Sequence, residues 1–136
     1  MAHYKIEAVE GIGPVYGEKL NSAGIKDTGE LLHALSTPAK RSAMAKETGI
    51  PEAHISRFSN MVDLFRIKGV GPQYSELLEA SGVDTIKELA QRVPSNLLKK
   101  MDEVNSAKNL SRRIPTEKEL VRWIEEAKTL PHVLEY

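Results

Sequence analysis

The apolar residues along this chain recur every three or four positions and seldom alternate with polar ones. After Pro51 they fall at Ile55, Phe58, Val62 and Phe65, the spacing of one face of an α-helix. The stretch after Pro115 repeats this spacing at Leu120, Trp123, Ala127 and Leu130. No stretch keeps the period-two alternation of a half-buried strand, and aromatic residues are few. The pattern predicts an all-α protein of about ten helices, many of them short.

Proline, glycine and short polar residues mark where these helices start and stop. Proline suits the first turn of a helix, which predicts helix starts at Pro14, Pro38, Pro72 and Pro94. An Asp-Thr pair precedes the next apolar run at 27–28 and again at 84–85, as expected of N-caps. Gly24 and Gly82 follow the apolar runs, where a left-handed cap is favoured, so both should have positive φ.

One stretch of the sequence occurs twice. "GIGPVYGEKLNSAGI" (11–25) aligns with "GVGPQYSELLEASGV" (69–83), and the match runs without a gap from 9–31 onto 67–89. Further on, the second copy needs about six extra residues, placed near 105–113, before the two align again. We expect two units that arose by internal duplication, 1–64 and 65–136, packed as one compact domain. The helix that starts near Pro51 should continue to about Arg66.

The Gly-apolar-Gly-Pro string at each repeat predicts a tight turn directly before a helix. Glycine reaches backbone angles closed to other residues, and its lack of a side chain allows close approach. The free N–H groups and the positive dipole end of the following helix favour an anion, most often phosphate. Ile12 and Val70 should point inward and fix each turn to the core.

Both strings resemble the helix-hairpin-helix motif of DNA-repair and recombination proteins, as in DNA polymerase beta and the N-terminal domains of recombinases. The chain from about Tyr4 to Leu130 also resembles the uncharacterised domain-of-unknown-function family 4332, mainly through "RIKGVGPQY" and "RRIPTEKELVRWIEEA". The first resemblance implies contact with DNA phosphates through the backbone, without reading of base sequence. The second implies no activity.

The helix-hairpin-helix resemblance also implies which residues would hold phosphate. The donors would be N–H groups of the second glycine and the first helical turn, within turns that begin at Gly11 and Gly69. These donors are Gly13, Val15 and Tyr16 in the first copy, and Gly71, Gln73 and Tyr74 in the second. Some proteins with this motif bind a monovalent cation through backbone carbonyls, which here would be those of Val9, Ile12, Ile67 and Val70. The sequence does not indicate whether this protein binds such a cation.

Charge distinguishes the two copies. Glu10 and Glu18 flank the first turn and would repel a phosphate, whereas Lys68 replaces Glu10 in the second copy, with Arg66 nearby. The insertion region adds four more candidate phosphate contacts, Lys99, Lys100, Arg112 and Arg113. The second turn is therefore the better candidate. Tyr16 and Tyr74 could stack on a base or contact phosphate, but half-buried packing beneath the turn is the stronger interpretation.

Composition limits the possible functions. The formal net charge is zero, which counts against strong electrostatic binding of nucleic acid. There is no Cys, the four His lack the spacing of a metal pair, and no catalytic arrangement is present, so we expect no enzyme, no metal and no cofactor. No apolar run approaches transmembrane length and no signal-peptide pattern opens the chain, which predicts a cytoplasmic protein without membrane contact.

The hypothesis from the sequence is a non-catalytic nucleic-acid-binding module that binds weakly and without sequence preference. The alternative is a protein-interaction or scaffolding module with the same fold and no DNA contact. Zero net charge and Glu10 favour the alternative, while Lys68, Arg66 and the basic insertion favour nucleic acid. DNA and RNA are not distinguished.

Overall fold

The computed structural model describes residues 3–136, and these confirm the all-α prediction. They contain no β-strand, and Lys5 and Asp27 form an isolated antiparallel bridge. The chain divides into two units. Unit 1 holds the described residues up to Asp63 together with His132–Tyr136, and unit 2 holds Leu64–Pro131.

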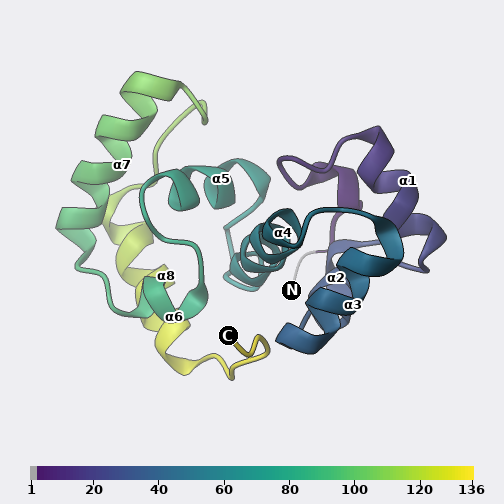
Figure 1. The fold of residues 1–136 in the computed structure, drawn as a ribbon. Helices are drawn as coiled ribbons and strands as arrows, with labels where there is room; N and C mark the ends of the chain where they lie inside the picture. Colours follow the sequence, from purple (N-terminus) through teal and green to yellow (C-terminus); the bar gives the residue numbers. More distant parts are fainter. Residues whose placement is uncertain (1–2) are drawn as a thin grey trace. The chain divides into compact units, whose positions relative to one another are not determined.

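Unit 1 contains one 3-10 helix and four α-helices, the last of which ends at the first residue of unit 2 (Figure 1). In chain order they are η1 (Ile6–Ala8), α1 (Pro14–Ser22), α2 (Thr28–Ala34), α3 (Pro38–Thr48) and α4 (Glu52–Leu64). The apolar face predicted for α4 is buried, since Ile55, Phe58 and Val62 have almost no exposed surface. Their burial supplies part of the core of unit 1.

Unit 2 is a four-helix array in which α8 packs against α6 and α7, while α5 packs against α7 (Figure 1). Its helices are α5 (Pro72–Ala80), α6 (Ile86–Ala90), α7 (Pro94–Lys108) and α8 (Glu117–Thr129). Trp123 of α8 is fully buried in the core cluster, as the sequence predicted for the last helix. Val70 is buried in the same cluster, and Ile12 is buried in unit 1, so both central turn residues point inward.

The predicted start signals are the ones that the structure uses. Each of the four predicted prolines is the first residue of its helix. Asp27 caps α2 by accepting a hydrogen bond from the Glu30 N–H (2.8 Å), and Thr85 caps α6 by accepting one from the Glu88 N–H (3.1 Å). The local rules of helix capping therefore fix these boundaries.

The ends of α1 and α5 share one hydrogen-bond pattern. The N–H groups of Gly24 and Ile25 donate to the carbonyls of Asn21 and Leu20, both at 3.0 Å. The N–H groups of Gly82 and Val83 donate to Glu79 and Leu78 in the same way. This is the Schellman motif, which requires a left-handed residue. The predicted positive φ is confirmed, at +93° for both glycines.

Gly24→Val should lower the free energy of unfolding by about 1–2 kcal/mol, the cost of a left-handed angle for a residue with a Cβ. Nothing lies within 4 Å of a Cβ built at Gly24, so the cost would come from the backbone and not from a clash. Gly24→Asn is the control, because Asn tolerates this angle. Urea unfolding followed by circular dichroism measures both variants, and equal losses for Val and Asn would disprove the assignment.

The last five described residues pack with unit 1, whereas the sequence placed them in the second unit. The Glu135 N–H donates to the Ser36 carbonyl (2.8 Å). The Arg41 guanidinium is buried and donates to the carbonyls of Leu35 and Glu135. Leu134 is buried as well. These residues lie beyond the repeat, so no internal match indicated where they belong.

Candidate nucleic-acid interface

Residues 67–71, the second glycine turn, lead directly into α5. Gly69 has φ +94°, and the Val70 N–H donates to the Ile67 carbonyl (3.0 Å), which tightens the turn. A Cβ at Gly69 would lie 3.2 Å from an Arg122 nitrogen and 3.3 Å from the Trp123 indole nitrogen. Two features therefore favour glycine at position 69: the left-handed backbone angle and the close approach of α8.

The N-terminus of α5 has no side-chain cap. Gly71 occupies the N-cap position without a cap hydrogen bond, and among residues 3–136 the N–H groups of Gly71, Gln73 and Tyr74 have no acceptor. Helix α7 also starts uncapped, but α2, α3, α6 and α8 each have a side-chain cap. The free donors and the positive end of the α5 dipole therefore face outward, where an anion can bind.

These donors border a hollow of about 610 Å³, the second hollow. Its lining comes from two segments that are far apart in the sequence, the start of α5 and the loop before α8. The lining residues are Gly71, Pro72, Gln73, Tyr74, Ser111, Arg112 and Arg113. The fold thus brings two of the predicted basic residues, Arg112 and Arg113, to the predicted phosphate donors. Lys99 and Lys100 are exposed on α7 and are not part of this lining.

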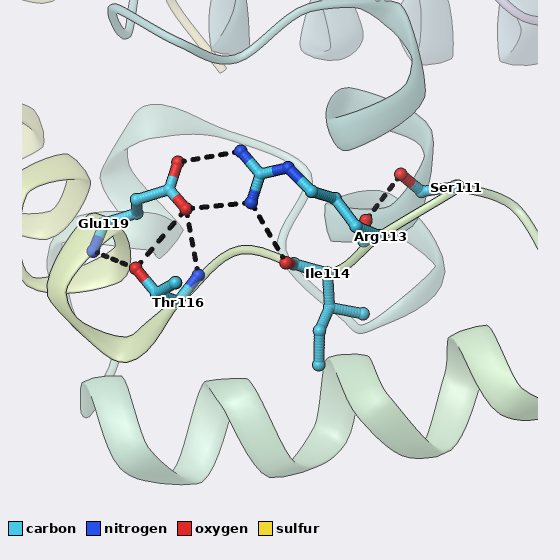
Figure 2. Close-up of polar contacts among 5 residues, drawn as sticks. All are labelled: Ser111, Arg113, Ile114, Thr116 and Glu119. Atoms are coloured by element: carbon cyan, nitrogen blue, oxygen red, sulfur yellow. Dashed lines mark hydrogen bonds and ion pairs between the residues drawn. The ribbon is translucent and has the colours of Figure 1, made fainter.

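The loop that carries these arginines is fixed by polar contacts (Figure 2). The Asn105 side chain accepts from the Ser111 N–H (2.9 Å) and donates to the Ser111 carbonyl (3.0 Å). The Ser111 hydroxyl donates to the Arg113 carbonyl (2.7 Å). Thr116 and Glu119 form a capping box at the start of α8. The loop is therefore anchored to the helices on both sides, which fixes the backbone that carries its arginines.

Arg113 and Arg112 differ in their partners. The Arg113 guanidinium donates to both Glu119 oxygens, at 3.1 and 3.4 Å, and these contacts hold the pKa of the Glu119 carboxyl below its usual range (Figure 2). Arg112 is exposed and has no hydrogen-bond or ion-pair partner among the described residues. The positive charge of Arg112 is thus available to a ligand, while that of Arg113 is largely neutralised.

Tyr74 packs as a wall of the second hollow. Its ring centroid lies 5.3 Å from that of Trp123, and the Arg113 guanidinium lies over the ring at 5.7 Å. Burial raises the pKa of the Tyr74 phenol, and the Arg113 charge partly opposes this rise. Tyr74 is half-buried, and these contacts favour the packing role over stacking on a base.

The other two basic residues predicted at the second glycine turn lie outside the lining of the hollow. Arg66 is half-buried, and its guanidinium donates to the Pro131 carbonyl. Lys68 is exposed, and its backbone N–H donates to Glu126 (3.2 Å). Arg66 thus has a structural contact between the two ends of unit 2, and Lys68 keeps its ammonium in solvent.

Residues 9–13, the first glycine turn, have the same backbone but different surroundings. Gly11 has φ +93°, and the N–H groups of Gly13, Val15 and Tyr16 have no acceptor within residues 3–136. A hollow of about 490 Å³ beside α1 is lined by Glu7, Pro14, Glu18, Asn21, Ser22 and Lys26. Two carboxylates against one ammonium make this first hollow a poor phosphate site.

The aromatic contacts also repeat. Tyr16 packs edge-on against Phe58, with centroids 6.3 Å apart, in the same relation as Tyr74 to Trp123. The Tyr16 hydroxyl lies 3.4 Å from Nδ1 of His54, so its polar end has a partner within unit 1. The carbonyls of Val9 and Ile67, two of the proposed cation ligands, accept the turn hydrogen bonds from Ile12 and Val70.

Sequence analysis missed one arginine at each turn. Arg57 donates to the Glu10 carbonyl (3.3 Å) and approaches Gly11, and Arg122 approaches Gly69. Arg122 is exposed and has no polar partner in the described part of the chain. The sequence did contain a signal for these arginines. Phe58 and Trp123 align between the two copies, and an arginine directly precedes each of them.

The zero net charge hides an uneven distribution. Residues 64–131 carry twelve Lys and Arg against ten Asp and Glu, and the rest of the chain carries seven against nine. Unit 2 is therefore at +2 and unit 1 at −2 in formal side-chain charge. The neutrality that argued against nucleic acid is a cancellation between units.

Comparison with known proteins adds a family. Residues 10–130 match a family model described as Domain of unknown function (DUF4332). The chain belongs to this family. The DUF4332 match includes residues 10–13 of the first glycine turn, all of the second glycine turn and the second hollow, and it agrees with the family resemblance of the sequence. No curated protein and no solved structure matched the chain. Membership of DUF4332 implies no activity, so function has to be inferred from the site.

Two further observations apply to residues 3–136. Every helix in this range is too short or too polar to cross a membrane. No group of three or more His, Asp or Glu side chains gathers there in a way that could hold a metal ion.

Proposed function

We propose that this DUF4332 protein is a non-catalytic, sequence-independent nucleic-acid-binding module. In this proposal the second glycine turn is a helix-hairpin-helix turn that holds a backbone phosphate in the second hollow. The N–H groups of Gly71, Gln73 and Tyr74 are the donors, and Arg112 supplies charge. The repeated turns and caps also favour an origin of the two units by duplication.

The convergence of Arg112 with an uncapped helix start carries the proposal. Residues 71–74 and 111–113 line the same hollow, although about forty positions of chain separate them. Backbone N–H groups together with a guanidinium form the usual donor set for phosphate, and none of them recognises a base edge. Binding through so few charges should be weak and strongly salt-dependent.

Unit 1 supports a second candidate function, contact with another protein. The first hollow is acidic. Val15 at the start of α1 is 65% exposed, the most exposed of the large apolar residues described, and it lines a neighbouring hollow with Glu18 and Glu47. An exposed apolar residue beside carboxylates suits a basic protein surface better than a phosphate. The first glycine turn should then contribute little to DNA binding.

A fluorescence-anisotropy titration with double- and single-stranded DNA at two salt concentrations tests the proposal. Binding at low salt that weakens steeply at higher salt, with similar affinity for unrelated sequences, is the expected result. Absence of binding at low salt would leave protein interaction as the function of the module.

Lys68→Glu should weaken DNA binding similarly for every sequence, because it places on the second turn the charge that Glu10 places on the first. The slope of log K against log salt should flatten by less than on loss of Arg112, because Lys68 does not line the second hollow. Glu10→Lys is the mirror variant and should strengthen binding if the first turn is a silent copy of the site. Lys46→Glu, an equal charge change at an exposed position of α3, is the control. If Lys68→Glu binds as well as wild type, the DNA contacts lie elsewhere.

A further inference from the structure

We infer that Glu119 is a built-in counterion that keeps Arg113 as a positioning residue and leaves Arg112 as the one free cation among the described residues that line the second hollow. This inference rests on the proposed function of the second hollow. It assigns a role to Glu119, which the sequence analysis did not single out. The ligand class that fits is a phosphate group carrying one negative charge, as in a nucleic-acid backbone.

Arg113 has its hydrogen-bonding capacity directed into the protein. Its guanidinium contacts both oxygens of Glu119 and donates to the Ile114 carbonyl at 3.4 Å (Figure 2). It also lies over the Tyr74 ring, 5.7 Å from the ring centroid. A two-oxygen contact between guanidinium and carboxylate is the most geometrically specific kind of ion pair. Arg113 therefore holds the loop against the start of α5 and has little charge left for a ligand.

Glu119 is itself held in place by the chain. The Thr116 N–H donates to a Glu119 oxygen (3.1 Å), and the Thr116 hydroxyl accepts from the Glu119 N–H (3.1 Å). The capping box holds the carboxylate at the start of α8. A phosphate would have to compete with this fixed carboxylate for Arg113.

Arg112 stands next to this pair without a partner. It lines the same hollow, is exposed, and makes no polar contact within residues 3–136. Among the described residues, the hollow is then bordered by the neutral Arg113–Glu119 pair, the free guanidinium of Arg112 and the positive dipole end of α5. That balance matches a phosphodiester, which carries one charge, better than a doubly charged phosphate.

Three variants separate the roles, measured by anisotropy with one DNA duplex across a salt series. Arg112→Gln should weaken binding about tenfold and flatten the slope of log K against log salt by about 0.9. Arg113→Gln should weaken binding less, because it leaves the Glu119 carboxylate unpaired beside the hollow, and it should leave the slope as in wild type, because no phosphate-neutralising charge is lost. Glu119→Gln should tighten binding and steepen the slope by about 0.9, because Arg113 becomes an uncompensated cation.

Glu119→Gln is a conservative test, since Gln also forms a capping box and keeps the start of α8. The gain it produces should vanish in the double variant Arg113→Gln with Glu119→Gln. Thermal unfolding provides the check on folding. Arg113→Gln and Glu119→Gln should lower Tm by similar amounts, because each removes the same ion pair. Arg112→Gln should leave Tm unchanged.

The inference is overturned if Arg113→Gln flattens the salt slope as much as Arg112→Gln does. It is also overturned if folded Glu119→Gln binds like wild type. In both cases wild type still binds DNA and the proposed function stands. If wild type shows no binding at low salt, the proposed function fails, and the assignment of a ligand to Arg112 fails with it.

Discussion

Trp123→Ala should lower the free energy of unfolding by about 3–5 kcal/mol, the range for removing a large aromatic side chain from a core. Trp123 has no exposed surface and packs against Tyr74 and the turn at Gly69. A small unit has few other large side chains to take its place, and total stabilities are only about 5–15 kcal/mol. Unit 2 should therefore become largely unfolded at moderate temperature.

Val121→Ala is the matched control for this prediction. Val121 lies two residues away on the same helix and is 44% exposed, so its truncation should change stability by less than about 0.5 kcal/mol. Urea titrations followed by circular dichroism measure both variants without relying on tryptophan fluorescence. A Trp123→Ala protein as stable as Val121→Ala would show that α8 is not anchored by this residue.

Removal of residues 132–136 should destabilise unit 1 by about 3 kcal/mol or more. The deletion exposes the pocket of the buried Leu134, worth about 2 kcal/mol, and removes an acceptor from the guanidinium of Arg41. A buried guanidinium with one of its two carbonyl partners missing is costly, because its charge is then poorly solvated. Proteolysis or urea unfolding of unit 1 reports the loss.

Arg41→Met separates the two contributions. In the shortened chain, Met at this position leaves no orphaned charge, so the deletion should cost less in the Met background than in wild type. His132→Ala, at an exposed position of the same segment, should have almost no effect. An equally small effect for the deletion itself would mean that the segment does not contribute to the fold of unit 1.

Much of the fold was predictable because its determinants are local. Pro14 and Pro72 start helices through their fixed φ, and Asp27 and Thr85 cap helices through side chains that reach three residues ahead. The positive φ of Gly24 and Gly82 also follows from position alone. Such rules act within a few residues, so the linear sequence contains them.

The remainder depends on contacts between distant segments. Nothing in the sequence indicated that Glu119 would neutralise Arg113, since adjacent arginines look equivalent until the loop is folded. Lys99 and Lys100 were predicted as phosphate contacts together with Arg112, but they lie on α7, outside the lining of the second hollow. Arg66 looked like a phosphate ligand and is instead engaged with the Pro131 carbonyl.

The return of residues 132–136 to unit 1 affects the order in which the chain can fold during its synthesis. All contacts within unit 2 become possible once residue 131 has left the ribosome, whereas unit 1 lacks its Leu134 and Glu135 contacts until residues 134 and 135 have emerged. Multidomain chains generally fold from the N-terminus first, at about 5–20 residues synthesised per second. Here unit 1 can complete the hydrogen bonds of Arg41 only after the whole of unit 2 has been synthesised.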